Sequence, residues 1–326
     1  MSAPLCSVCG TPLVGGACPR GHPQRATRHT GKRSRRLEAL ALLILLITGA
    51  LYGGLIWYPR KAAEDFAQPV SADFAEALGA YRAAVGAFPP GTTDPSVMID
   101  AAGRMTQAIG PARDVLTTSR DGLEANTIST IPVISDRPPL DEAKALQEDL
   151  ANFYPSALEV MARLERVAAY LAEVSPALGS LNEMIPLLTG PVVESGSADK
   201  AVAPAAEVVG FLDATAPPEE TGGLHSALQA IAGQINEDVA RLANIDEPSP
   251  VAKALLSGLR NDLGTFGETL GKAGVLARRA GLGRPITDAK QAVAETIAGL
   301  IALRDEHGLS GITVPDVEDP AAGVGA

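Results

Sequence analysis

The sequence predicts an all-α protein with one transmembrane helix and a helical bundle outside the membrane. Hydrophobic residues make up 46% of the 326 residues, but aromatic residues only 4%. A core of Ala, Leu and Val suits packed helices better than a β-sandwich. A 20-residue uncharged run, 39–58, predicts the membrane helix, and apolar residues at helical spacing over 143–185 predict the bundle.

Charge and cysteine are unevenly distributed along the chain. Residues 1–38 carry seven Lys or Arg and one acid, whereas the remainder carries 20 basic and 37 acidic residues. The two ends are therefore expected to face different surroundings. All three cysteines fall within the first eighteen residues. An odd number of closely spaced thiols indicates a metal site in a reducing compartment and argues against a disulfide framework.

The first 24 residues carry a complete set of metal ligands. Cys6 and Cys9 are separated by two residues and followed by Gly10, and eight residues later comes Cys18-Pro-Arg-Gly-His22. Three thiolates and one imidazole match the tetrahedral preference of zinc, and a C-x2-C pair closed by a second pair is typical of a structural site. So short a segment has almost no apolar core, so we expect bound zinc to supply its folding free energy.

These residues, Cys6 to His22, resemble a zinc ribbon of the kind found at the start of many bacterial proteins, some of which continue into one transmembrane helix and an extracellular domain. The second pair departs from the commoner Cys-Pro-x-Cys, because three residues separate Cys18 from His22. The fourth ligand is therefore left open between His22, which the spacing favours, and His29. Four protein ligands would leave no coordination position for water. We therefore expect the zinc site to be structural and not catalytic.

The predicted transmembrane helix, 38–58, follows a basic juxtamembrane segment, 25–37. Twenty uncharged residues at 1.5 Å each span the roughly 30 Å of a bilayer core. The excess of Lys and Arg lies upstream, so the positive-inside rule predicts a cytoplasmic N-terminus and an extracytoplasmic C-terminal domain at the plasma (inner) membrane. Trp57 and Tyr58 then fall at the outer interface, before Pro59, where the helix is expected to leave the membrane.

Two further interpretations concern this helix. Gly49 and Gly53 form a G-x-x-x-G pair, through which two copies of the helix could pack as a homodimer. A buried core helix and a cleaved signal peptide are the competing explanations of the apolar run. A buried core helix of a soluble protein normally shows a polar face, which this run lacks. A cleaved signal peptide has a shorter basic region and a shorter apolar core than this segment.

The region 60–190 is expected to be an extracytoplasmic set of helices. Segments 60–88 and 96–120 have helical spacing and are separated by a proline-rich turn, whereas 126–139 is expected to be an extended loop. The clearest pattern alternates gaps of three and four residues, which is a heptad-like, coiled-coil-like seam. Its members are Ala143, Leu146, Leu150, Phe153, Ala157, Val160, Leu164, Val167, Leu171, Val174, Leu178, Leu181 and Ile185. Pro155 and Pro176 are expected to kink or split this helix.

The remainder is predicted as a linker, a second helical region and a tail. Residues 191–223 are rich in Gly, Pro, Ser and Ala and are expected to form a linker around a short helix at 201–212. The second region, 224–308, comprises helices at 224–245, 249–280 and 286–307, with a turn at 281–285, and 309–326 is expected to be a flexible tail. His225 and His307 are expected to be surface or capping residues.

The sequence contains no recognisable catalytic signature. A Ser197-x-x-Lys200 match lies in the predicted linker without its partner motifs. We therefore expect a non-enzymatic, membrane-anchored interaction or sensor protein of the cell envelope, with protein partners on either side of the lipid bilayer. The alternative is a membrane-tethered nucleic-acid-binding regulator that uses the zinc knuckle and the basic segment, although topology and anionic lipid explain those basic residues better. An envelope enzyme with a scattered site is a third hypothesis.

Overall fold

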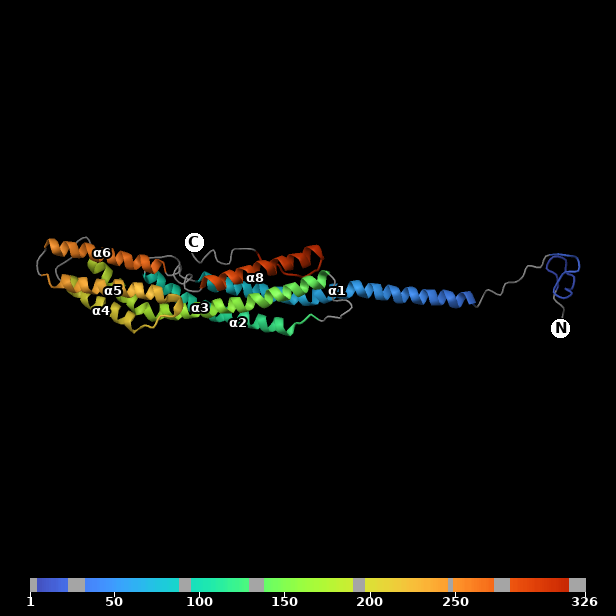
Figure 1. Cartoon of the computed structure of the whole chain (residues 1–326), viewed down its shortest axis with the longest axis horizontal. Coiled ribbons are helices and arrows are strands. Elements are labelled where there is room, and N and C mark those ends of the chain that lie inside the picture. The colour runs from blue at the N-terminus through green and yellow to red at the C-terminus, as the bar shows by residue number, and fades with distance from the viewer. Residues whose placement is uncertain are drawn as a thin grey trace. The chain divides into compact units, whose positions relative to one another are not determined.

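The computed structural model describes residues 5–22, 33–87, 95–128, 138–189, 197–245, 249–272 and 282–316. They form two compact units, 1–57 and 58–326. The described residues contain seven α-helices and no β-strand, which confirms the all-α fold (Figure 1). The elements are α1 (Arg33–Gly86), α2 (Pro95–Ala125), α3 (Pro138–Thr189), α4 (Ser197–Ala214), η1 (Glu219–Thr221), α5 (Gly222–Ala243), α6 (Pro250–Gly271), α8 (Gly283–Ile301) and the π-helical turn η3 (Ala302–Glu306).

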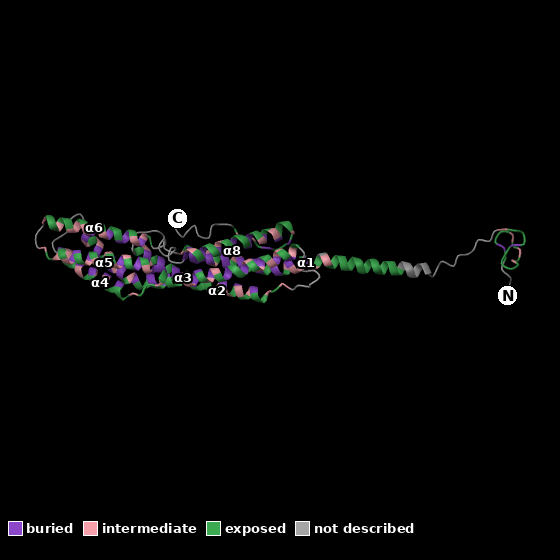
Figure 2. Ribbon diagram, in the orientation of Figure 1, coloured by how far each residue is buried: buried purple, intermediate pink, exposed green. Residues whose placement is uncertain are grey.

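Helix α3 is the central element of the second unit. Every residue of the predicted seam is buried except Ile185, which is half-buried (Figure 2). Pro155 and Pro176 were expected to kink or split this helix, and they do not split it, because α3 continues through both of them and through Pro186 for 52 residues. A kink at these positions stays a prediction. An interior proline costs about 3 kcal/mol or more. Burial of large side chains close to these prolines, such as Phe153 two residues before Pro155, offsets that cost, since each contributes roughly 1.5–3 kcal/mol.

The other helices of this unit surround different parts of α3. Helices α2 and α8 and the C-terminal part of α1 lie along one part, and α4, α5 and α6 lie along the other (Figure 1). One hydrophobic cluster runs through all of them. The predicted helical regions 60–190 and 224–308 therefore share a single core.

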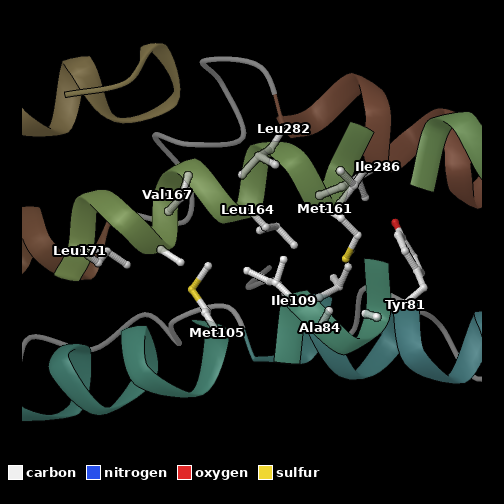
Figure 3. Packing of buried hydrophobic residues seen from close by; sticks show 14 of the residues in the cluster. Tyr81, Ala84, Met105, Ile109, Met161, Leu164, Val167, Leu171, Leu282 and Ile286 are labelled. Atoms are coloured by element: carbon white, nitrogen blue, oxygen red, sulfur yellow. The ribbon is translucent and has the colours of Figure 1, made fainter. Parts of the chain in front are cut away.

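Aliphatic side chains make up most of this core. In Figure 3, Met105 and Ile109 of α2 face Leu164 and Leu171 of α3, and all four side chains are buried. A group of aromatic residues packs around Phe153 of α3. Its ring makes edge contacts with Phe74 at 5.3 Å and Tyr81 at 6.0 Å between centroids. Such pairs add about 0.5–1.5 kcal/mol each beyond the area they bury.

Segment 191–223 contains more structure than a linker. Helix α4 has 18 residues, and its buried face consists of Ala201, Ala205, Val208 and Leu212. The small alanines allow α4 to pack against both α3 and α5. Its Glu207 carboxylate also accepts a hydrogen bond of 2.9 Å from the Ser180 hydroxyl of α3. The sequence predicted a short helix at 201–212 within a linker, and α4 extends that helix at both ends. Composition could not show this, because Ala, Ser and Pro occur both in loops and in tightly packed helices.

Helix α1 continues through Pro59 and Pro69 to Gly86. The exit from the membrane at Pro59 stays a prediction, because a helix can leave a membrane without ending. It is long and apolar enough to cross a membrane, and none of its most apolar window is buried. Large side chains lie exposed along that window, among them Leu45 at 72%. From Ala63 onward the same helix buries one face in the core of the second unit.

Residues 309–316, predicted as part of a flexible tail, are docked on α1 together with Gly308. Leu309 and Ile312 are buried, and the backbone N–H of Thr313 donates to the Ser71 hydroxyl at 3.1 Å. Arg60 donates to the Gly308 carbonyl at 2.6 Å, and the Ser310 hydroxyl lies 2.8 Å from the Glu64 carboxylate. Burial of Leu309 and Ile312, together with the hydrogen bonds between backbone groups of the segment and side chains of α1, explains the docking. The rest of the predicted tail, 317–326, lies outside the described residues.

His225, expected at the surface, is buried in α5 beside α3. Its Nδ1 lies 3.3 Å from the Tyr170 hydroxyl, and the two rings make an edge contact at 5.8 Å. Burial lowers the pKa of His225, against the opposing effect of Asp213. Nearby, the carboxylate of Glu220 is only 2% exposed and pairs with Arg166 of α3. Burial alone would raise the pKa of Glu220, but the hydrogen bond from Arg166 and further contacts lower it. These contacts attach the start of α5 to α3.

Substitution of Gly311, in the docked segment, and of Gly79, in α1, should have opposite effects on stability. Gly311 has φ +76°, and an added Cβ would lie 2.7 Å from Gln68 Nε2, whereas Gly79 in α1 has open space. Gly311→Ala should lower the free energy of unfolding by about 1–2 kcal/mol. Gly79→Ala should raise it by about 0.5–1 kcal/mol. Urea unfolding of the full chain measures both, and equal effects would contradict the docking.

His225 predicts a stability loss in weak acid. Because its folded pKa is lowered, the unfolded chain binds the proton more readily, so stability is complete above the unfolded value near 6.5 and falls as the pH drops below it. His225→Gln should show a smaller loss than the wild type between pH 7.5 and 5.5 in thermal unfolding. The Glu220 contribution is lost only at lower pH, where that carboxylate protonates. Parallel pH profiles for the two proteins would rule out the assignment.

Candidate metal centre

Two tight backbone turns carry the four predicted ligands. In the first, the Gly10 N–H donates to the Cys6 carbonyl at 2.9 Å, and the Cys6 N–H donates to the Thr11 carbonyl at 2.8 Å. Gly10 has φ +67°, which an L side chain adopts only at a cost. This turn directs the sulfurs of Cys6 and Cys9 to the same side, as their spacing suggested.

The second turn is brought to the first by a short hairpin. Val14 and Ala17 exchange two backbone hydrogen bonds of 3.1 Å around Gly15 and Gly16, which have φ +62° and +86°. Positive φ at both central residues is the property of the type I′ turn favoured in two-residue hairpins. After the hairpin, the Gly21 N–H donates to the Cys18 carbonyl at 2.9 Å, and this turn places His22 beside Cys18.

The donor atoms converge on one point. Cys9 Sγ and Cys18 Sγ are 3.6 Å apart, His22 Nδ1 is 3.6 Å from Cys18 Sγ, and it is 4.0 Å from Cys6 Sγ. All four donors lie within 4.8 Å of one another. A tetrahedral zinc with Zn–S of about 2.3 Å and Zn–N of about 2.0–2.1 Å requires S–S of about 3.8 Å and S–N of about 3.6 Å. The cluster can therefore hold a metal ion with little rearrangement.

Local electrostatics favour the thiolate, which is the form that binds metal. Backbone N–H groups of Val8 and Cys9 are the main cause that lowers the pKa of Cys6 to about 6. The Arg20 N–H is the main cause that lowers the pKa of Cys18. The hydrogen bond to Cys18, followed by that to Cys6, raises the pKa of His22. In the absence of metal the cluster thus stabilises a proton on His22, which a bound cation would displace.

Four protein donors complete a tetrahedron, so no coordination position remains for a substrate or water. Cys6 and Cys18 are buried although they lie in a segment with hardly any apolar core. The Thr11 hydroxyl lies 2.6 Å from Cys9 Sγ and can donate to that thiolate. A donor that hydrogen-bonds to a metal ligand in this way holds the ligand in its orientation. Sequence spacing gave no indication of Thr11, because a hydroxyl near a ligand has no motif of its own.

The remaining candidate residues are placed as follows. His29, the alternative fourth ligand, lies outside the described residues, as do Arg25, Arg28 and Lys32. Trp57 is 64% exposed and Tyr58 is half-buried. A Cβ added at Gly49 or Gly53 would meet nothing within 4 Å. The glycine face of α1 therefore carries no packing partner among the residues that the structure describes.

Comparison with known proteins does not extend this assignment. No protein-family model matches the chain, and neither the curated proteins nor the solved structures yielded a match. The class that the fold and the site define is an all-α protein with an N-terminal Cys3His cluster able to bind a metal ion.

The choice of fourth ligand is testable by titrating the full chain with Co²⁺, whose thiolate charge-transfer and tetrahedral d–d bands report the donor set. His22→Ala should weaken binding by more than the roughly 10- to 100-fold that is typical of losing a second-shell partner. His29→Ala should leave the spectrum and the affinity unchanged. The reverse result would make His29 the ligand.

Proposed function

We propose that the chain is a membrane-anchored, non-enzymatic interaction or sensor protein of the cell envelope, with a structural zinc site in the cytoplasm. The single observation that supports a membrane anchor is that the most apolar window of α1 is fully exposed. Large apolar side chains lie there without cover, including Leu42, Leu45, Leu46 and Leu51. A continuous apolar surface of this size is unfavourable in water but is compatible with lipid.

The donor set supports zinc as the metal. Soft thiolates with one imidazole in a closed tetrahedron match structural zinc sites, whereas calcium and magnesium require oxygen ligands. When bound, zinc would supply the free energy that folds the knuckle. Thiols remain reduced in the cytoplasm, and the basic residues upstream of the apolar run favour the same side.

An interaction role agrees with what the helical unit offers. Its grooves, as far as the chain is described, lie open to solvent between neighbouring helices. A long bundle with a broad solvated surface is suited to contacting another protein or a small ligand. The knuckle can contact a second partner on the other side of the membrane.

Cysteine accessibility in intact cells tests the anchor and its orientation. In a background with Cys6, Cys9 and Cys18 changed to Ser, the exposed Ser257 of α6 is replaced by Cys. A membrane-impermeant maleimide should label Ser257→Cys in intact cells, after outer-membrane permeabilisation if an outer membrane is present. The matched control, Ser7→Cys in the same background, should label only after lysis.

Each outcome has a distinct meaning. Labelling at position 257 alone supports the anchor and directs the search for partners of the bundle to the envelope. Labelling at position 7 alone reverses the orientation. Labelling of both positions only after lysis, with the protein recovered in the soluble fraction, contradicts the anchor.

A further inference from the structure

The side chains of the N-terminal knuckle alternate between two faces. Two antiparallel bridges join Leu5 to Pro12 and Val14 to Ala17. Residues that stand directly opposite each other in such a pair point to the same side, and so do residues two apart along one strand. One side, here called the outer face, therefore consists of Leu5, Pro12, Val14 and Ala17. The residues next to them in sequence, Cys6 and Cys18, point to the other side, where the metal ligands meet.

Burial follows this alternation. Cys6 and Cys18 on the metal side are buried, whereas on the outer face Leu5 is 61% exposed and Val14 is 74% exposed. The other two members of the outer face are exposed as well. The described knuckle is a single layer, so it contains no second layer that could cover this face. Apolar side chains gathered on one face in this way indicate a surface that something outside the knuckle covers.

The chemistry of the outer face and of its surroundings limits what can cover it. None of its four side chains carries a charge or a hydrogen-bonding group, so the face is unsuited to an ion or a polar small molecule. The surrounding sequence is uniformly basic, because residues 1–37 contain seven Lys or Arg and no Asp or Glu. An anionic lipid surface matches both properties. Apolar side chains enter the boundary between headgroups and acyl chains, and basic side chains stay among the phosphates.

Chain length keeps the knuckle close to the apolar part of α1. Only residues 23–32 separate the described knuckle from Arg33, where α1 begins. A segment of about ten residues spans at most about 33–36 Å when it is fully extended. The candidate membrane span begins soon afterwards, at Ala39. In a chain anchored through that span, the outer face therefore stays within reach of the bilayer surface at a high effective concentration.

We propose that the outer face of the knuckle docks on the anionic leaflet of the membrane in which α1 is anchored. Leu5 and Val14 enter the boundary between headgroups and acyl chains, and the metal side stays turned towards the cytoplasm. The inference rests on the membrane anchor proposed above, but not on the identity of any protein partner. A soluble protein could also cover an apolar face. It would not account for the absence of carboxylates from 1–37, and the short tether favours the lipid.

Tryptophan fluorescence of the full chain, loaded with Zn²⁺ in lipid nanodiscs, tests the docking. The chain has a single tryptophan, so Trp57→Phe with Val14→Trp places one reporter on the outer face. Bromine on the acyl chains of phosphatidylcholine quenches a tryptophan that inserts beside it. We expect quenching in an equal mixture of phosphatidylserine and brominated phosphatidylcholine. Quenching should be weaker in brominated phosphatidylcholine with unbrominated phosphatidylcholine in place of the serine lipid, and weaker in high salt, which screens the attraction between basic residues and anionic lipid.

One further substitution assigns the docking to the outer face. Leu5→Ser in the reporter chain should lower the docking equilibrium about tenfold, because transfer of one leucine side chain from water contributes at least that factor. The Co²⁺ spectrum of Leu5→Ser should match that of its parent, which shows that the metal site is intact. The matched control, Val251→Ser, removes a side chain of the bundle that is also 61% exposed and should leave the quenching unchanged.

The anchor and the docking fail in different ways. A chain that does not enter the nanodiscs contradicts the anchor, and the docking with it. A chain that enters them while the reporter at position 14 stays unquenched and emits as in water overturns the docking alone, and leaves the outer face to a protein partner. Quenching that is equal in the two lipid compositions, or that Leu5→Ser does not reduce, also overturns the docking.

Discussion

Burial of the α3 seam is the interaction on which the helical unit depends. A repeat of three and four residues places one apolar stripe along α3 from Ala143 to Ile185, and no single neighbouring helix covers all of it. Helices α2 and α8 and part of α1 cover one part, and α4, α5 and α6 cover the other. Truncation of any one seam leucine to alanine in such a core typically costs 2–5 kcal/mol. The continuity of α3 through its prolines follows from the same burial.

The two ends of the chain are stabilised by different physical means. In the bundle, many aliphatic side chains each contribute a small transfer free energy, and the ion pair of Glu220 with Arg166 and the contact of His225 with Tyr170 fix which helix meets which. The knuckle has too few apolar residues for that mechanism. Its turns are determined by glycines with positive φ, and the four donors are left to a metal ion to hold together. Loss of the metal would therefore unfold the knuckle without weakening the packing around α3.

By itself the sequence determined the features that depend on local spacing. The heptad-like gaps identified the buried face of α3, the uncharged run identified an apolar helix, and the Cys and His spacing identified a cluster whose donors the backbone turns then bring together. Only the tertiary structure decided the features that depend on partners distant in sequence. It extended the short helix predicted at 201–212 into α4 and packed it against α3 and α5, docked 308–316 on α1, and buried His225 against Tyr170. The physical reason is that composition and periodicity report what a segment can do alone, whereas helix continuity through proline and the burial of a polar ring are determined by the surfaces that pack against them.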